Sequence, residues 1–346
     1  SLLATQLISR VRDALEVELP LISLFNHPSV AEFAADVAEA SGITPPAPIP
    51  LCDRSKPLPL SFAQQRLWFL DQLEPGNPVY NVPWAMQLDG PLNTQAMQGA
   101  IDDLVQRHET LRTLFSVTMG KPQQCVLAKT EVPLESVDAT GDTPEQIEQR
   151  LYNLSRMPFG LGQTPLMRVH ILHVENQRHV ILLVLHHIIS DGWSLGVLYQ
   201  ELVTLYRAHC MNVAANLPPL PLQYADYSVW QQDWFRSSEQ QRQLDYWKQQ
   251  LQDAPALLDL PTDRPRPQVQ SLNGSRFTFE LEDELAGEVI ELSAQQRTTL
   301  YTTMLTAFNV LCHRYCAQDD IVVGSPMAGR NQPELSDIIG YFVSPV

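Results

Sequence analysis

The stretch "HVILLVLHHIISDGWSLGVL", residues 179–198, contains an apolar run, two adjacent histidines, an Asp-Gly pair and the start of a helical pattern. Residues 180–185 are all apolar, which is typical of a central strand covered on both faces. The run is far shorter than the roughly 20 residues of a membrane-spanning helix. The sequence therefore predicts a buried strand, a turn at Asp191-Gly192 and then a helix. We expect an α/β (α+β) fold built around this strand.

The two histidines cannot play the same part. Successive side chains of a strand point to opposite faces, so His186 and His187 do not both face one site while the strand stays regular. Histidine titrates near neutral pH and can accept or donate a proton, which favours chemistry at a strand end. A single histidine there is nevertheless more often structural, and Asp191 before a glycine is ordinary in a turn. The residues alone support both interpretations about equally.

Helices are predicted along the rest of the chain by period and by capping boxes. Residues 1–15 have one apolar stripe, and residues 100–115 carry apolar side chains at helical spacing. Ser29 with Glu32 and Ser61 with Gln64 form two capping boxes, and residues 283–315 have the pattern of two helices.

Strands and a linker complete the prediction. Residues 169–174 and 179–187 are separated by "ENQR", which predicts a hairpin. The alternation in "SRFTFEL" (275–281) predicts a strand, and "DIVVGSP" (320–326) predicts a buried one. The proline-rich stretch 41–60 has no period and predicts a semi-rigid linker.

Charge and cysteine content narrow the function classes. The chain has 346 residues with 23 Lys and Arg against 39 Asp and Glu, a net charge of −16, which argues against nucleic acid as a partner. The five cysteines show no disulfide spacing, so we expect a reducing compartment and a cytoplasmic protein without a membrane segment or signal peptide. Cys312 and Cys316 flank His313 without further ligands nearby, and we predict no metal site.

"HHIISDGWS", residues 186–194, resembles the His-His-x-x-x-Asp-Gly active-site signature of condensation domains of nonribosomal peptide synthetases. These domains belong to the chloramphenicol-acetyltransferase-like group. Further segments agree with the family in its order along the chain: "SFAQQRLWFL" (61–70), "RHETLRTLF" (107–115), "YADYSVWQ" (224–231) and "VVGSPMAGRNQPELSDIIGYFV" (322–343).

Residues 1–39 resemble the back half of a peptidyl carrier domain, whose serine carries 4′-phosphopantetheine covalently. "SLLATQLISRV" fits that motif from its serine onward, which makes Ser1 the attachment residue. The resemblance implies a C-terminal carrier part over 1–42, a linker over 43–58, an N-terminal condensation lobe over 59–232 and a C-terminal lobe over 233–346. The implied fold is a two-lobed, V-shaped pseudodimer with the second lobe incomplete.

The resemblance implies an amide-forming acyltransferase. The amine of one carrier-bound substrate attacks the thioester of an aminoacyl or peptidyl group on the upstream carrier, and the partners are both carrier domains and the adenylation domain of the assembly line. His187 is the catalytic candidate, either as general base or by orienting the amine and stabilising the oxyanion, and His186 is structural. Gly192 lets substrate approach closely. Asp191 is expected to form an ion pair that holds the loop, with Arg66 as first choice of partner and Arg330 as second.

Rival functions are separated by particular features. The segments 61–70 and 191–198 resemble the subtype that takes an L-configured donor. An epimerization domain shares both histidines, whereas a non-catalytic recruitment domain of the same fold usually has a damaged histidine motif. The carrier-like segment argues against a free-standing acyltransferase that uses coenzyme A.

Overall fold

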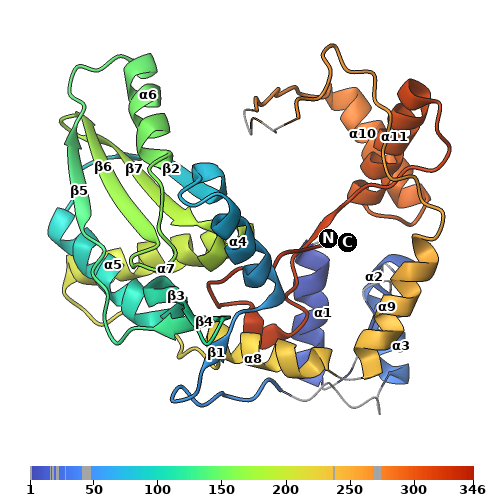
Figure 1. Cartoon of the computed structure of the whole chain (residues 1–346), viewed down its shortest axis with the longest axis horizontal. Coiled ribbons are helices and arrows are strands. Elements are labelled where there is room, and N and C mark those ends of the chain that lie inside the picture. The colour runs from blue at the N-terminus through green and yellow to red at the C-terminus, as the bar shows by residue number, and fades with distance from the viewer. Residues whose placement is uncertain are drawn as a thin grey trace. The chain divides into compact units, whose positions relative to one another are not determined.

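The computed structural model describes residues 2–15, 17, 19–20, 23–27, 29–40, 48–236, 238–268, 271 and 274–346. The chain forms two compact units (Figure 1). One comprises residues 1–47, 242–325 and 331–333, and the other comprises residues 48–241, 326–330 and 334–346. All residues of the histidine signature belong to the second of these, which we call the signature unit.

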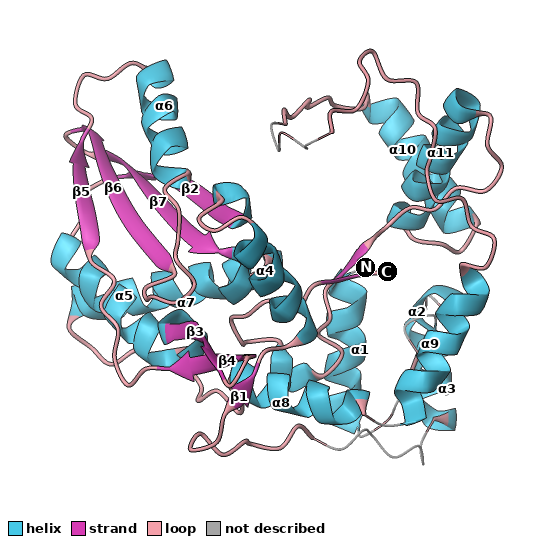
Figure 2. Ribbon diagram, viewed as in Figure 1, coloured by secondary structure: helices cyan, strands magenta, loops and turns pink. Residues whose placement is uncertain are grey.

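A four-stranded sheet forms the centre of the signature unit (Figure 2). Its order is β2 (Asn81–Asp89), β7 (Arg178–His186), β6 (Met167–Glu175) and β5 (Leu134–Asp138), with β5 parallel to β6 and the other pairs antiparallel. Strand β7 has a neighbour on each side and is buried from Ile181 to His186. The predicted central strand and the β6–β7 hairpin are therefore confirmed.

Helices of the signature unit pack with this sheet into one hydrophobic cluster, which includes Leu104, Leu183 and Leu198. They are α4 (Phe62–Leu73), α5 (Thr94–Arg107), α6 (Pro144–Ser155), α7 (Gly192–Met211) and α8 (Tyr224–Phe235). The capping box at the start of α4 is confirmed, because the Ser61 hydroxyl accepts a hydrogen bond from the Gln64 amide at 3.1 Å.

The helical spacing over 100–115 overstates the length of the helix. Helix α5 ends at Arg107, and His108 has extended backbone dihedrals. The buried His108 side chain places Nε2 2.7 Å from a carboxylate oxygen of Glu201 on α7. This tertiary contact takes the chain out of the helix, although the apolar spacing continues to Leu111.

A small three-stranded sheet follows that helix end. Its order is β1 (Leu58–Pro59), β4 (Lys121–Val126) and β3 (Thr113–Thr118), with both pairs antiparallel. Short 3-10 helices lie at η1 (Pro78–Tyr80), η2 (Glu109–Arg112), η3 (His187–Ile189) and η4 (Pro333–Leu335).

The second half of the predicted linker is fixed to the signature unit. The Cys52 amide donates to Oδ1 of Asp226 at 2.7 Å, and the Arg54 guanidinium donates to both oxygens of the same carboxylate at 2.6 and 2.9 Å. Ile49 is buried against α8. The expectation of a semi-rigid tether is wrong for residues 48–57, because buried polar groups on α8 need the partners that this segment supplies. The predicted domain boundaries stay a prediction.

Replacing Arg54 by leucine is expected to loosen this segment. The variant leaves the buried Asp226 carboxylate with fewer donors, at a cost of about 2 kcal/mol in the free energy of unfolding. Amide exchange at Cys52 should become faster. Arg178→Leu, which breaks only an exposed pair with Asp89, is the control and should change stability by less than about 1 kcal/mol. Unchanged exchange at Cys52 in Arg54→Leu would contradict the attachment.

The remaining helices carry the other predictions. They are α1 (Leu2–Leu15), α2 (Ser23–Asn26), α3 (Val30–Glu39), α9 (Ser238–Gln250), α10 (Asp283–Gln295) and α11 (Leu300–Cys316). The helices predicted over 1–15 and 283–315 are confirmed, and so is the capping box of Ser29 and Glu32. In the described part of the chain, no helix has the length and apolar character needed to cross a membrane.

The two strands predicted near the C-terminal end are wrong. Residues 274–282 are irregular and exposed, with Phe277 86% exposed, and residues 320–325 are irregular and no more than half-buried. Pairing there is confined, in the described residues, to the short strands β8 (Pro326–Met327) and β9 (Ser344–Pro345). An alternating pattern gives a strand only where a neighbouring strand accepts and donates its backbone hydrogen bonds.

Candidate active site

His186 is the last residue of β7 and is buried. Its side chain is held by the Ile188 amide, which donates to Nδ1 at 3.1 Å. Burial, and to a lesser degree the neighbouring His187, lower the pKa of His186 to about 4. His186 is therefore neutral at pH 7, and its imidazole is a hydrogen-bond acceptor that shapes the turn.

This lowered pKa predicts a pH-dependent stability. Below pH 6.5 the unfolded chain binds a proton at His186 that the folded chain refuses until about pH 4, so stability is lost as pH falls through that window. Between pH 7 and pH 5 the loss from this group is about 2 kcal/mol. In His186→Asn the amide oxygen can replace Nδ1 as acceptor without titrating. Urea unfolding at the two pH values should show a smaller difference for the variant, and an equal difference would refute the assignment.

His187 has a different environment, because the chain leaves the strand and enters η3 at this residue. Its side chain is only half-buried. Nδ1 lies 2.7 Å from the carbonyl oxygen of Ser190. A carbonyl only accepts, so Nδ1 carries the proton and the neutral ring keeps its lone pair on Nε2. One face of the ring meets Tyr341, with ring centroids 4.7 Å apart.

Asp191 ties the loop after the histidines to a distant segment. Its Oδ1 accepts from the amide and the hydroxyl of Ser194, at 2.8 and 2.7 Å, and so caps α7. Its Oδ2 accepts from the Phe342 amide at 3.1 Å. The carboxylate is almost fully buried. Asp191 is therefore an anchor of the loop.

Arg330, rather than Arg66, is the ion-pair partner of Asp191. Nη2 of Arg330 lies 3.2 Å from Oδ1 of Asp191, and both side chains are buried. Arg66 instead donates to the hydroxyl of Tyr341 at 2.6 Å. The first choice of partner was wrong because both arginines are distant from Asp191 in the sequence, and only the packing of residues 330–342 against α7 decides between them.

Gly192 and Ser1 complete the predicted residues. Gly192 is the first residue of α7, and a methyl group built on its Cα meets no atom within 4 Å. No protein contact requires glycine there, and the space beside it is open. Ser1 lies outside the described residues.

Sequence reasoning missed the side chains that support the loop from α4 and α8. Gln64 is fully buried and donates from Nε2 to the Ile188 carbonyl at 3.2 Å. The Ser61 hydroxyl lies 2.7 Å from the Tyr224 hydroxyl, which donates to the Tyr341 carbonyl. The available signal was Gln64 itself, since a polar residue on the apolar side of a helix usually has a buried partner.

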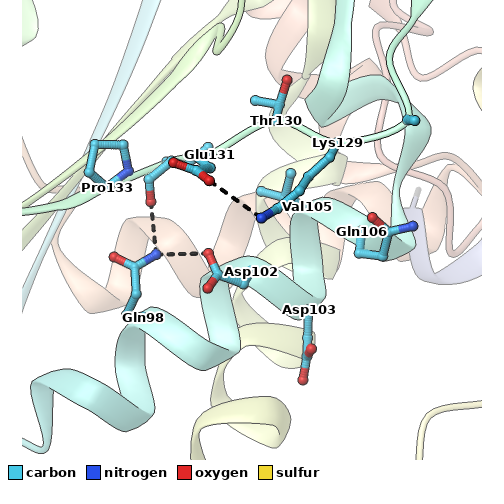
Figure 3. A pocket seen from close by; sticks show the side chains of 11 residues that line it. Gln98, Asp102, Asp103, Val105, Gln106, Lys129, Thr130, Glu131 and Pro133 are labelled. Atoms are coloured by element: carbon cyan, nitrogen blue, oxygen red, sulfur yellow. Dashed lines mark hydrogen bonds and ion pairs between the residues drawn. The ribbon is translucent and has the colours of Figure 1, made fainter.

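Two cavities lie away from the histidines. One, of about 640 Å³, is lined by α5 side chains such as Gln98 and Asp102 and by residues 128–133 (Figure 3). The other, of about 400 Å³, is lined by residues of α5, α7, β2 and β7 such as Met86 and Tyr199. Neither is lined by a residue of the signature, so the candidate site is defined by the loop after β7.

Comparisons with known proteins agree with this site. The family model of the condensation domain matches residues 54–346, and that of the phosphopantetheine attachment site matches residues 1–37. Linear gramicidin synthase subunits C and B of Brevibacillus parabrevis are 44% and 41% identical to 99% of this chain. The chain spans only 4% and 7% of their lengths.

Solved structures share the fold. The X-domain in complex with OxyB from teicoplanin biosynthesis superposes with a TM-score of 0.78 and 26% identity over 88% of this chain and 67% of that one. The first condensation domain of the CDA synthetase gives a TM-score of 0.70 at 22% identity, over 84% and 70%. The predicted fold class is confirmed. The chain therefore belongs to the condensation-domain family of nonribosomal peptide synthetases, and its N-terminal residues belong to a carrier domain of the kind that bears covalent 4′-phosphopantetheine.

Proposed function

We propose that this chain catalyses peptide bond formation between two carrier-bound substrates in the cytoplasm, as an amide-forming acyltransferase. The observation that carries the proposal is the state of His187. Its Nδ1 is held by the Ser190 carbonyl, and its Nε2 lone pair stays available on a half-buried ring. His186, two atoms of backbone geometry away from the turn, is buried and neutral and takes no part in proton transfer.

The reaction joins the acceptor amine to the donor thioester. A bond forms between the donor carbonyl carbon and the acceptor nitrogen, the bond from that carbon to sulfur breaks, and one proton passes from nitrogen to sulfur. Phosphopantetheine, when bound to a carrier serine such as Ser1, supplies that thiol and the reach. The protonation of Nδ1 supports His187 as the acceptor of the amine proton at Nε2, because a neutral ring in this state has no N–H left for the oxyanion.

The loop anchors keep His187 in place during this step. The buried pair of Asp191 and Arg330, together with Arg66 behind Tyr341, supports the loop without contact to substrate. Positioning of two reactants supplies much of the rate of such a reaction, because it replaces a bimolecular encounter by an intramolecular one.

The decisive experiment uses the complete synthetase module that contains this chain, with a loaded upstream carrier and an aminoacyl-loaded downstream carrier. Intact-mass spectrometry then follows both carriers. Peptide on the downstream carrier supports condensation, and an L-configured donor reacting faster than its D-form supports the L-donor subtype. Scrambling at the α-carbon without any acceptor would show an epimerization domain.

A third outcome would replace the proposal by a recruitment function. The teicoplanin X-domain, which shares this fold, was solved in complex with OxyB. If no acyl transfer occurs but the module binds a tailoring enzyme, the chain is a recruitment domain. The complete His-His-x-x-x-Asp-Gly signature at 186–192 favours the catalytic outcome.

Gly192→Leu tests whether the open space beside α7 belongs to the substrate. Glycine is not required there by the protein, so the helix should gain up to about 1 kcal/mol of stability from leucine. Condensation is expected to fall at least about tenfold, because the side chain occupies the space that substrate needs. Gly196→Leu is the matched control, since Gly196 is also an exposed glycine of α7 with no atom within 4 Å. Equal activity of the two variants would reject the role of Gly192.

A further inference from the structure

The segment Ile339–Phe342 reaches the histidine loop from far along the chain and is held at every residue. Side chains of three helices and a loop bind its backbone. Thr110 donates to the Ile339 carbonyl at 3.0 Å, Ser194 to the Gly340 carbonyl at 2.8 Å and Tyr224 to the Tyr341 carbonyl, while Asp191 accepts from the Phe342 amide. The backbone on both sides of Tyr341 is therefore fixed relative to β7 and α7.

Gly340 shows how tightly this segment is packed. A methyl group on its Cα would lie 2.0 Å from Cδ2 of the Tyr224 ring, so no other residue fits there without movement of α8. The side chain that follows, Tyr341, is therefore presented from a backbone that has little freedom to shift.

The Tyr341 side chain is held at its other end as well. It is only 5% exposed, and its hydroxyl accepts a hydrogen bond from Nη2 of Arg66 at 2.6 Å. Its ring lies against the His187 imidazole, with centroids 4.7 Å apart and an angle of 58° between the ring planes. The imidazole is thus restrained by the Ser190 carbonyl at Nδ1 and by an aromatic ring on one face.

We propose that Tyr341 is a positioning residue that fixes the plane of the His187 ring, and that Arg66 acts through Tyr341. This inference rests on the proposed function, in which His187 is the reacting residue. It also gives the loop anchor a route to the chemistry: Asp191 binds the Phe342 amide, next to Tyr341, and so fixes the ring that faces His187.

Single-turnover kinetics of the complete module separate positioning from mere support. The donor is loaded on the upstream carrier, and the acceptor is mixed in excess. For Tyr341→Leu we expect the rate constant to fall about 30-fold with full product amplitude, because every molecule is folded but the imidazole is misaligned. A structural role alone would lower the amplitude and leave the rate constant unchanged, which would overturn the proposal. Tyr199→Leu, an exposed tyrosine of α7 that contacts Trp84, is the control and should match the wild type.

The link to Arg66 is tested by a double-mutant cycle. Tyr341→Phe keeps the ring and loses the hydroxyl, and Arg66→Met removes the donor. Each is expected to lower the rate constant about threefold to tenfold, and the double variant should be no slower than the worse single one, because both break the same hydrogen bond. Additive effects would overturn the assignment of Arg66.

A readout that does not need catalysis distinguishes the two levels of proposal. Diethyl pyrocarbonate acylates a free imidazole nitrogen, and peptide mapping gives the rate at His187, where Nε2 is the open position. Tyr341→Leu should change that rate at least about threefold and Tyr199→Leu should not. If the wild type forms no peptide, the proposed function fails while this measurement still decides on Tyr341. An unchanged acylation rate in Tyr341→Leu would reject its positioning role.

Discussion

His187→Ala is expected to lower peptide formation by about 10²–10⁴-fold, the range that a positioned acid or base supplies. The variant should remain folded, because the half-buried side chain makes a single hydrogen bond, to the Ser190 carbonyl. Product on the downstream carrier, followed by intact mass, measures the rate. The urea unfolding midpoint verifies the fold. His209→Ala, on α7, is the control because His209 pairs only with the exposed Asp103.

A second variant separates the two roles of His187. In His187→Gln the terminal amide can reach the region of Nε2 and form hydrogen bonds, but it does not accept a proton near neutral pH. If proton transfer is the main contribution, His187→Gln should be as slow as His187→Ala. If positioning of the amine suffices, it should recover to within about tenfold of the wild type. Wild-type activity in His187→Ala would remove this residue from the mechanism.

Arg330→Met is expected to give the largest loss of stability, about 3–5 kcal/mol, since it leaves the buried Asp191 carboxylate without its counter-charge. The guanidinium also donates to the carbonyl of Ile338 at 2.7 Å and lies 4.0 Å from the Phe342 ring centroid. All of these contacts connect residues 330–342 to α7. Urea unfolding measures the change.

Coupling distinguishes the ion pair from general packing at Arg330. Asp191→Asn retains an acceptor for the Ser194 amide but loses the charge, so the double variant with Arg330→Met should be less destabilised than the sum of the two single variants. Arg66→Met is the comparison within the same site and should cost far less, because Arg66 donates to a neutral hydroxyl. Equal losses in Arg330→Met and Arg66→Met would contradict the assignment of Arg330 to Asp191.

Local signals explain the parts of the fold that the sequence predicted correctly. The uninterrupted apolar run 180–185 is interpretable because a strand buried on both faces needs no alternation. The capping boxes at Ser29 and Ser61 depend on residues three positions apart, so both helix starts were predictable. The failures at 275–281 and 320–326 have the opposite cause, since a strand depends on a neighbour that its own residues do not specify.

The candidate site divides in the same way. The signature at 186–192 identified both histidines and the anchoring aspartate before any coordinates, and the resemblance assigned different parts to His186 and His187. The chemical state of each ring was not predictable, because it depends on which nitrogen meets the Ile188 amide or the Ser190 carbonyl. The restraint from Tyr341 was likewise missed.

By itself, the sequence determined the family, the central strand and the residues of the histidine loop, because these depend on short-range patterns. Only the tertiary structure decided that Arg330 rather than Arg66 pairs with Asp191, that residues 48–57 are bound to α8, and that Tyr341 lies on the His187 ring. Each of these joins residues distant in sequence through a buried polar or aromatic contact. Burial makes such contacts strong, and packing alone selects the partner.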